Sequence, residues 1–258
     1  MSGILRAELR KITTTRLWWI MLIAVLLLSA GYAIGVAVLQ PNTGAPLDDP
    51  GIVRSVYNAG NPAVRVLALV LGIATMGLEY RHQTLAATYL ATPRRNRVLL
   101  GKAVSLVLFG LLYGAASVLA GVLAAAPFVL TGRGSFFFDR GDTWRSLVLG
   151  VVSMALWTMI GMGIGILIKN LLVAMLVGIS FAYLIEPILA LVCYLRDYDS
   201  ALNLLPTGAT NAMLGITSPV MFASGNPIAW WQGALLLAAW CLLPAAIAIL
   251  STVRRDIA

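Results

Sequence analysis

Residues 147–194 read LVLGVVSMALWTMIGMGIGILIKNLLVAMLVGISFAYLIEPILALVCY, which is two apolar runs separated only by Lys169 and Asn170. At about 1.5 Å of rise per residue, each run is long enough to cross a hydrocarbon core about 30 Å thick. A backbone in lipid must satisfy its own polar groups, so runs this apolar are expected to be helices. The two-residue interruption therefore predicts a tight helical hairpin whose two arms span a membrane.

Four more charge-poor stretches lie outside this hairpin in the sequence. Together with it they predict six transmembrane helices, at residues 17–39, 63–78, 103–130, 147–168, 171–194 and 231–250. The composition agrees, because 60% of residues are hydrophobic, 11% are charged and the mean hydropathy is +0.91. A soluble domain would be about a quarter charged. We therefore expect an all-α integral membrane protein in which residues 1–258 form a single transmembrane domain.

The basic residues indicate which side of the membrane each helix end faces. With the N-terminus inside, most of the 18 Lys and Arg residues fall in inner segments, and those in outer segments are balanced by Asp residues. This bias predicts that both termini are cytoplasmic. The net charge of +8 then reflects topology and attraction to anionic membrane lipid. Nucleic acid is not an expected partner, because the basic residues are split among short segments without an aromatic platform.

The chain lacks the residue patterns that usually carry chemistry. His82 is its only histidine, and Cys193 and Cys241 fall at different predicted depths, so neither a metal site nor a disulfide is expected. No nucleophile elbow of the form G-x-S-x-G occurs, and no phosphate loop of the form G-x-x-x-x-G-K-[ST]. We therefore predict no catalytic residues and no cofactor bound by this chain, so any ATP hydrolysis requires a partner.

Residues 3–14 have the spacing of an amphipathic helix that precedes the first span. Ile4, Leu9 and Ile12 fall on one arc with basic residues opposite, and Glu8 interrupts the pattern. A basic amphipathic helix at this position is expected to lie in the plane of the lipid headgroups. A plain membrane anchor and a mechanical role are both compatible with it.

Glycines recur within the predicted spans at spacings that let helices approach closely. They are Gly31 and Gly35, Gly110 and Gly114, and Gly161, Gly163 and Gly165. Small residues at such spacings favour helix–helix packing in membranes. They do not identify which helix is the partner.

The stretch 79–102, EYRHQTLAATYLATPRRNRVLLGK, is the only sizeable inner surface between spans. Thr84 can cap a short helix, and Pro93 biases the chain out of helix after it. Arg94 and the basic residues that follow then begin a second helix, which enters the membrane at Lys102. A short stiff helix joined directly to two spans can act as a lever, because force on it moves both of them.

This stretch resembles the signature of type-2 ABC permeases, the six-span membrane subunits of ABC exporters. The residues that carry the resemblance are Glu79, the pairs Thr84-Leu85 and Thr92-Pro93, Leu90, and the run Leu100-Gly101-Lys102. Gln83 stands where many members of the family have glycine. The amphipathic N-terminus and the closing Arg254-Arg255-Asp256 fit the same family, so the resemblance extends over essentially the whole chain.

The resemblance implies roles for three segments of this chain. Residues 84–93 would be the coupling helix that docks on a separate ATPase subunit, and residues 3–14 the connecting helix. Residues 201–226 would form short outer helices that dip back toward the membrane, although a solvated loop fits them equally well. The implied coupling residues are Glu79, Thr84, Leu85, Tyr89, Leu90, Pro93 and Arg94.

A member of this family would form half of the membrane domain of an exporter in a bacterial plasma membrane. The resemblance implies two ABC ATPase subunits, which bind ATP and Mg, and a second permease copy or a similar permease subunit. Spans two and five would line the substrate path, with Met76, Phe181, Tyr183 and Glu186 as candidate lining residues. The apolar spans favour export of a hydrophobic or amphipathic substrate, such as an antibiotic, another drug or a natural product. A lipid or a glycan is the alternative.

Glu186, followed by Pro187, is an acid well inside the fifth predicted span. Ionisable residues at such depth usually face a bundle interior or a wet cavity. One interpretation is a group facing substrate or protons in a transport path, next to a proline kink. The other is a carboxylate near the outer interface that pairs with Arg196 or another outer arginine.

Three other classes of function are compatible with the sequence. An ion-coupled secondary transporter would use Glu186 as its coupling site and would work without ATP. A membrane-embedded enzyme would need clustered catalytic groups, and the sequence offers only Glu186 and scattered outer Asp residues. A non-transporting anchor or sensor subunit would need neither a coupling site nor clustered catalytic groups.

Overall fold

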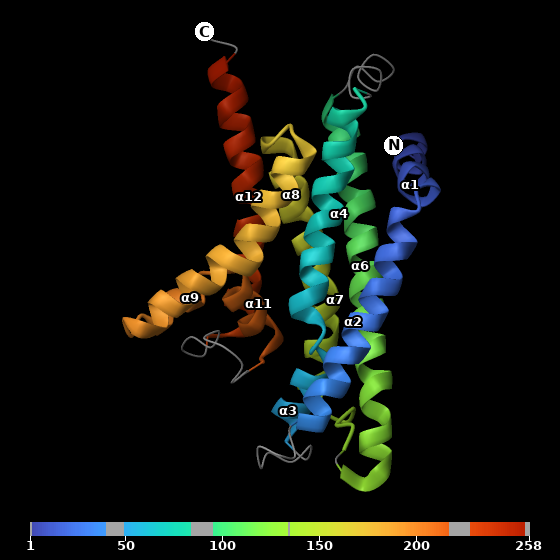
Figure 1. The fold of residues 1–258 in the computed structure, drawn as a ribbon, viewed down its shortest axis with the longest axis vertical. Helices are drawn as coiled ribbons and strands as arrows, with labels where there is room; N and C mark the ends of the chain where they lie inside the picture. The colour runs from blue at the N-terminus through green and yellow to red at the C-terminus, as the bar shows by residue number, and fades with distance from the viewer. Residues whose placement is uncertain (1, 40–48, 84–94, 134, 217–227, 256–258) are drawn as a thin grey trace.

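The computed structural model describes residues 2–39, 49–83, 95–133, 135–216 and 228–255, which are almost entirely helical (Figure 1). In chain order, with η marking a π-helical segment, the elements are α1 (Ser2–Thr14), α2 (Leu17–Leu39), α3 (Pro50–Tyr57), α4 (Asn61–Arg81), α6 (Arg95–Phe128), η2 (Val129–Arg133), α7 (Gly141–Leu167), α8 (Leu171–Ser180), η3 (Phe181–Ile185), α9 (Glu186–Leu195), α10 (Asp199–Leu202), α11 (Pro206–Leu214) and α12 (Trp230–Arg255). These described residues contain no strand, so the predicted all-α class is confirmed for them.

Several helical runs are long and apolar enough to cross a membrane. Five meet that condition: Leu17–Leu39, Pro50–Arg81, Arg97–Thr131, Gly141–Leu167 and Leu171–Leu195. The sixth predicted span, residues 231–250, falls in α12, where the described apolar part, Trp230–Pro244, is shorter. The structure thus agrees with a multi-pass membrane protein, whereas six crossings and cytoplasmic termini stay predictions.

The hairpin predicted between the fourth and fifth spans is present. α7 ends at Leu167 and α8 begins at Leu171. Asn170 caps α8, because its side-chain oxygen accepts hydrogen bonds from the backbone N–H groups of Leu172 and Val173. A short polar side chain at this position satisfies N–H groups that the first turn of a helix leaves open.

Some helices extend beyond the predicted spans, because hydropathy does not mark the polar ends of a helix. α6 begins at Arg95, within the basic stretch where the sequence predicts a helix that enters the membrane at Lys102, and α7 begins at Gly141 instead of residue 147. The loop after the first span is expected from its composition to be irregular, but it contains α3. Asp49 caps this helix with its side chain, which explains why a proline-rich and asparagine-rich stretch can still form a helix.

The packing centres on α4 and α7. In the α3–α4 run, 72% of the most apolar window is buried inside the protein, against 22% in α2, and its mean hydropathy of 1.6 is the lowest of the five. A span surrounded by protein needs less apolar surface than one surrounded by lipid. The two helices approach so closely that a methyl group at Gly72 would meet the backbone of Thr158 and Met162, and one at Gly161 would meet the backbone of Leu69.

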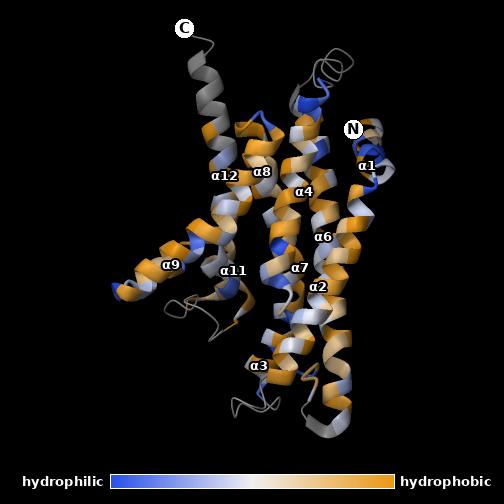
Figure 2. Cartoon of the chain, viewed as in Figure 1, coloured by the Kyte–Doolittle hydropathy of each residue, from blue (hydrophilic) through white to orange (hydrophobic). Residues whose placement is uncertain are grey.

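The fifth span bends where η3 joins α8 to α9. Pro187 in the first turn of α9 has no N–H to donate, and in a regular α-helix its ring would clash with the carbonyl group four residues earlier, that of Tyr183. A π-helical turn accommodates such a defect and bends the helix. α8 packs against α4, whereas α9 turns away from the bundle (Figure 1). Figure 2 shows that α9 and much of α2 are apolar, as surfaces that meet lipid or another apolar chain are.

Candidate functional sites

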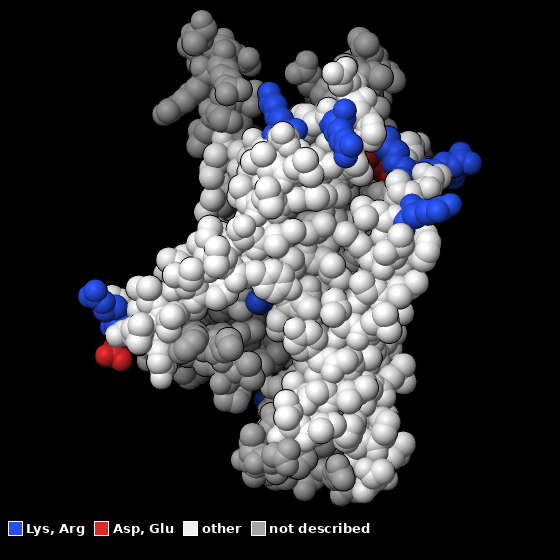
Figure 3. Space-filling view, in the orientation of Figure 1, with Lys and Arg blue, Asp and Glu red and all other residues white. Residues whose placement is uncertain are grey.

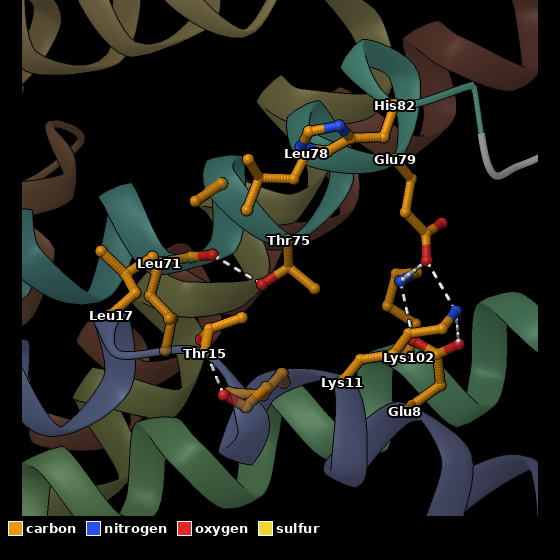
Figure 4. A pocket seen from close by; sticks show the side chains of 12 residues that line it. Glu8, Lys11, Thr15, Leu17, Leu71, Thr75, Leu78, Glu79, His82 and Lys102 are labelled. Atoms are coloured by element: carbon orange, nitrogen blue, oxygen red, sulfur yellow. Dashed lines mark hydrogen bonds and ion pairs between the residues drawn. The ribbon is translucent and has the colours of Figure 1, made fainter.

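A group of four charged residues, three of them buried, joins α1, α4 and α6. It consists of Glu8, Lys11, Glu79 and Lys102 and is termed the charge cluster below. Lys102 Nζ donates to Glu8 Oε2 at 2.7 Å and to Glu79 Oε1 at 2.8 Å. Lys11 Nζ donates to Glu8 Oε1 at 2.6 Å and to Glu79 Oε1 at 2.9 Å. Figure 4 shows these side chains converging from three helices.

The charge cluster explains why Glu8 interrupts the apolar arc of α1. Glu8 lies on the buried face of that helix together with Ile12, and its side chain is only 3% exposed. Its charge is met there by Lys102 of α6, which is equally buried. α1 is therefore held to α4 and α6 by ion pairs as well as by apolar packing.

The charge cluster also links the two ends of residues 84–94. Glu79 lies on α4 before this segment and Lys102 lies on α6 after it, and the structure brings the two side chains together. Glu79 is thus the implied coupling residue whose position is known. The predicted coupling helix, residues 84–93, lies outside the described residues, and so do Thr84, Leu85, Tyr89, Leu90, Pro93 and Arg94.

A cavity of about 340 Å³ opens beside the charge cluster. Its apolar walls include Ile12, Leu71 and Leu78, and its polar wall is formed by the charge cluster and His82 (Figure 4). Glu79 Oε2 is buried without a hydrogen-bond partner, although the other oxygen of the same carboxylate binds both lysines. The cavity therefore combines apolar space with one polar wall, an arrangement that suits a small amphipathic group.

Because of Lys11, the stability that the charge cluster contributes is expected to fall at alkaline pH. Burial alone would lower the pKa of Lys11, but hydrogen bonds with Glu79 and Glu8 and their negative charges outweigh it, so its pKa lies above the ordinary value of 10.5. The stabilisation by Lys11 is therefore fully present below pH 10.5 and is lost as the pH rises through the raised pKa. We expect the difference in Tm between the wild type and Lys11→Met to shrink over that interval. Thermal unfolding of both proteins in detergent checks this, and a constant difference would contradict it.

A second buried site lies between α4, α7, α9 and α11. The guanidinium group of Arg65 lies over the ring of Trp157, 5.4 Å from its centroid. Trp157 Nε1 in turn donates to Thr210 Oγ1 at 3.1 Å. Glu186 accepts a hydrogen bond from the backbone N–H of Thr207, in the first turn of α11. We refer to this arrangement as the Arg65–Glu186 site.

The charges of the Arg65–Glu186 site are buried but incompletely satisfied. Arg65 is 8% exposed and Glu186 is 2% exposed. Arg65 Nε, Arg65 Nη1 and Glu186 Oε2 have no hydrogen-bond partner in the described structure. The two charges are near enough to act on each other, yet no ion pair joins them in the part of the chain that the structure describes. Buried charges without direct partners cost stability, so such a site is more typical of function than of folding.

The structure separates the four candidate path residues. Glu186 and Tyr183 both lie within electrostatic range of Arg65. Met76 instead lies in the apolar core, where it faces Gly165 of α7. Phe181 packs on Trp240 of α12, with ring centroids 5.8 Å apart. For Glu186, the structure shows a carboxylate inside the bundle, whereas Arg196 is exposed at the end of α9.

Sequence reasoning missed Arg65, Glu8 and Lys102 as site residues. A signal for Arg65 is present, because it is an ionisable residue inside the predicted span 63–78, where charges are usually functional. Glu8 offers a weaker signal as the one acid on an apolar arc. Lys102 resembles an ordinary basic residue at a membrane boundary, so only the fold shows its burial.

Comparison of the chain with protein-family models and with characterised proteins gave no match.

Proposed function

We propose that this chain is the transmembrane permease subunit of an ABC exporter in a bacterial plasma membrane. In this proposal the chain is not itself an enzyme, and two separate ATPase subunits bind ATP and Mg and drive transport. The observation that carries the proposal is the charge cluster, which binds together the two helices that flank residues 84–94 and the amphipathic α1. A segment connected in this way is suited to receive force from a partner and pass it to the membrane helices.

The path of that force follows from the contacts. Movement of residues 84–94 acts on α4 and α6 together, because Glu79 and Lys102 are paired. α1 follows through Glu8, which binds the same lysine. α4 passes the movement to α7 through their close backbone contact at Gly72 and Gly161. ATP can switch such a bundle only if its binding favours one arrangement by several kcal/mol, so the contacts must be stiff.

The remaining surfaces suit the other partners that this function needs. The α8–α9 run is only 22% buried over its most apolar window, as is α2. These faces are available for membrane lipid and for a second permease copy or a similar subunit. The substrate is proposed to be a hydrophobic or amphipathic antibiotic, drug or natural product, with a lipid or glycan as the alternative.

A charged residue in the proposed docking helix tests this function. We expect Leu85→Glu or Tyr89→Glu to reduce export about tenfold or more while the protein still inserts, because burying an unpaired charge at the docking contact costs several kcal/mol. Leu85→Met and Tyr89→Phe are matched controls that should keep export. The measurement is ATP-dependent transport in proteoliposomes that contain the permease and the ATPase subunit that purifies with it. Full export by both charged variants would refute the docking role.

An ion-coupled secondary transporter is the second candidate, and the buried Glu186 with its free Oε2 favours it. The same proteoliposomes separate the two functions. A secondary transporter works without ATP and stops when the ion gradient is dissipated. The proposed exporter stops without ATP and continues without the gradient.

A further inference from the structure

We propose that the Arg65–Glu186 site binds the zwitterionic headgroup of an amphipathic molecule, with an anionic group on Arg65 and an amine on Glu186. That this molecule is the exported substrate rests on the proposed function, whereas its binding does not. The inference starts from buried groups that the fold leaves without partners.

Arg65 supplies the anion-binding half of the site. Trp157 covers one face of its guanidinium group, and the cation–π contact leaves the N–H groups in the plane of that group available. Two of its nitrogens, Nε and Nη1, are buried and have no acceptor in the described structure. Guanidinium N–H groups in a dry site bind carboxylate or phosphate oxygens strongly. The fixed Trp157 ring, held by Thr210, orients the group for this purpose.

Glu186 supplies the other half. One of its oxygens accepts the N–H of Thr207, which fixes the carboxylate at the start of α11, and the other oxygen is free. A purely anionic ligand on Arg65 would meet the charge of Glu186, and a purely cationic ligand would meet Arg65. A headgroup that carries both charges satisfies both residues. This complementarity selects the zwitterion.

The surface of the bundle is hollowed where α9 turns away from it. Figure 3 shows that the molecule is hollowed between α9 and the end of the bundle near α3, and that blue atoms of basic side chains appear inside the hollow. Tyr183, which lies within electrostatic range of Arg65, is 57% exposed. Leu184 and Ile188 are exposed nearby in the sequence and offer apolar surface for a tail.

The test uses the purified chain in an uncharged maltoside detergent without any ATPase. The probes are lauroyl lysophosphatidylethanolamine and Nε-lauroyl-lysine, which present a phosphate–amine and a carboxylate–amine headgroup. Dodecyl phosphate carries only negative charge and dodecylamine only positive charge, and these two compounds serve as the single-charge probes. We expect at least one zwitterion to bind with a Kd about tenfold or more below that of either single-charge probe, and the tighter zwitterion identifies a phospholipid or an amino-acid headgroup.

The variants assign the binding to the two residues. Arg65→Gln and Glu186→Gln should each weaken zwitterion binding about tenfold or more, whereas Arg196→Gln, a matched change at an exposed arginine directly after α9, should leave it unchanged. Without ligand, Arg65→Gln should be at least as heat-stable as the wild type, because two nitrogens of the buried guanidinium group have no hydrogen-bond acceptor in the described structure. Unchanged affinity in both site variants, or equal binding of single-charge probes, would overturn the proposal. If Arg65→Gln aggregates, Arg65→Lys decides: reduced affinity supports the site and wild-type affinity overturns it. The binding test needs no ATPase, so a finding that the chain does not export in an ATP-dependent way would refute the proposed function and leave the binding proposal standing.

Discussion

Replacing Lys102 with methionine is expected to lower the free energy of unfolding by roughly 3–5 kcal/mol. Lys102 is the buried partner of both Glu8 and Glu79, at 2.7 Å and 2.8 Å. Its removal leaves two buried carboxylates with only Lys11, which is 44% exposed and is shared between them. A carboxylate left in apolar surroundings without its partner is strongly unfavourable, so α1 should separate from α4 and α6.

Lys11→Met is the matched control for this prediction. It removes a lysine that binds the same two carboxylates but lies largely in solvent, so a loss of about 1 kcal/mol or less is expected. Adding Glu8→Gln and Glu79→Gln to Lys102→Met should recover part of the stability, because the buried charges then disappear together. Thermal and denaturant unfolding of the detergent-solubilised proteins measures all of these. Equal losses for the two lysine variants would show that burial of Lys102 does not matter.

Replacing Gly161 with alanine is expected to lower the free energy of unfolding by about 1–3 kcal/mol. A methyl group at this position would overlap the backbone of Leu69, and backbone cannot rotate away as a side chain can. α4 and α7 must therefore move apart along their central contact. If the chain is the proposed exporter, its transport activity should also fall in protein that remains folded, because α4 carries residues of both the charge cluster and the Arg65–Glu186 site.

Gly31→Ala and Gly35→Ala provide the comparison within the same chain. A methyl group at either glycine would meet no atom within 4 Å in the described structure. Alanine also favours helix over glycine, so unchanged or slightly raised Tm values are expected. A destabilisation as large as that of Gly161→Ala would mean that another molecule packs on this face of α2.

These glycines show what sequence pattern can and cannot predict. The spacing of Gly31 and Gly35 equals that of Gly110 and Gly114, yet only the second pair packs against another helix, at Ala155 and Val151 of α7. Spacing records that a helix could approach another, but not whether one is present. The all-helical fold and the hairpin at residues 169–170 follow from apolar length alone, which is why they were predictable.

The two sites depend on long-range pairing and were correspondingly less predictable. Glu186 was recognisable because an acid inside an apolar run is unusual in itself. Its neighbour Arg65 lies on a different span, 121 positions earlier in the numbering, and only the packing of α4 against α7 and α8 brings them together. The low hydropathy of the second span is typical of a helix surrounded by protein. The same low value is also typical of a helix that does not cross the membrane, so hydropathy alone does not place this span at the centre.

If the chain is the proposed exporter, the bend at Pro187 has a consequence for how its substrate enters. α8 stays beside α4, but α9 departs from it (Figure 1), and the molecular surface is hollowed beside α9 (Figure 3). If this hollow faces the hydrocarbon core of the bilayer, lipid acyl chains enter it, and an amphipathic compound dissolved among them approaches the Arg65–Glu186 site by lateral diffusion. Substrate binding would then need no aqueous vestibule. The hydrophobicity of the substrate would set its concentration in the bilayer next to the site.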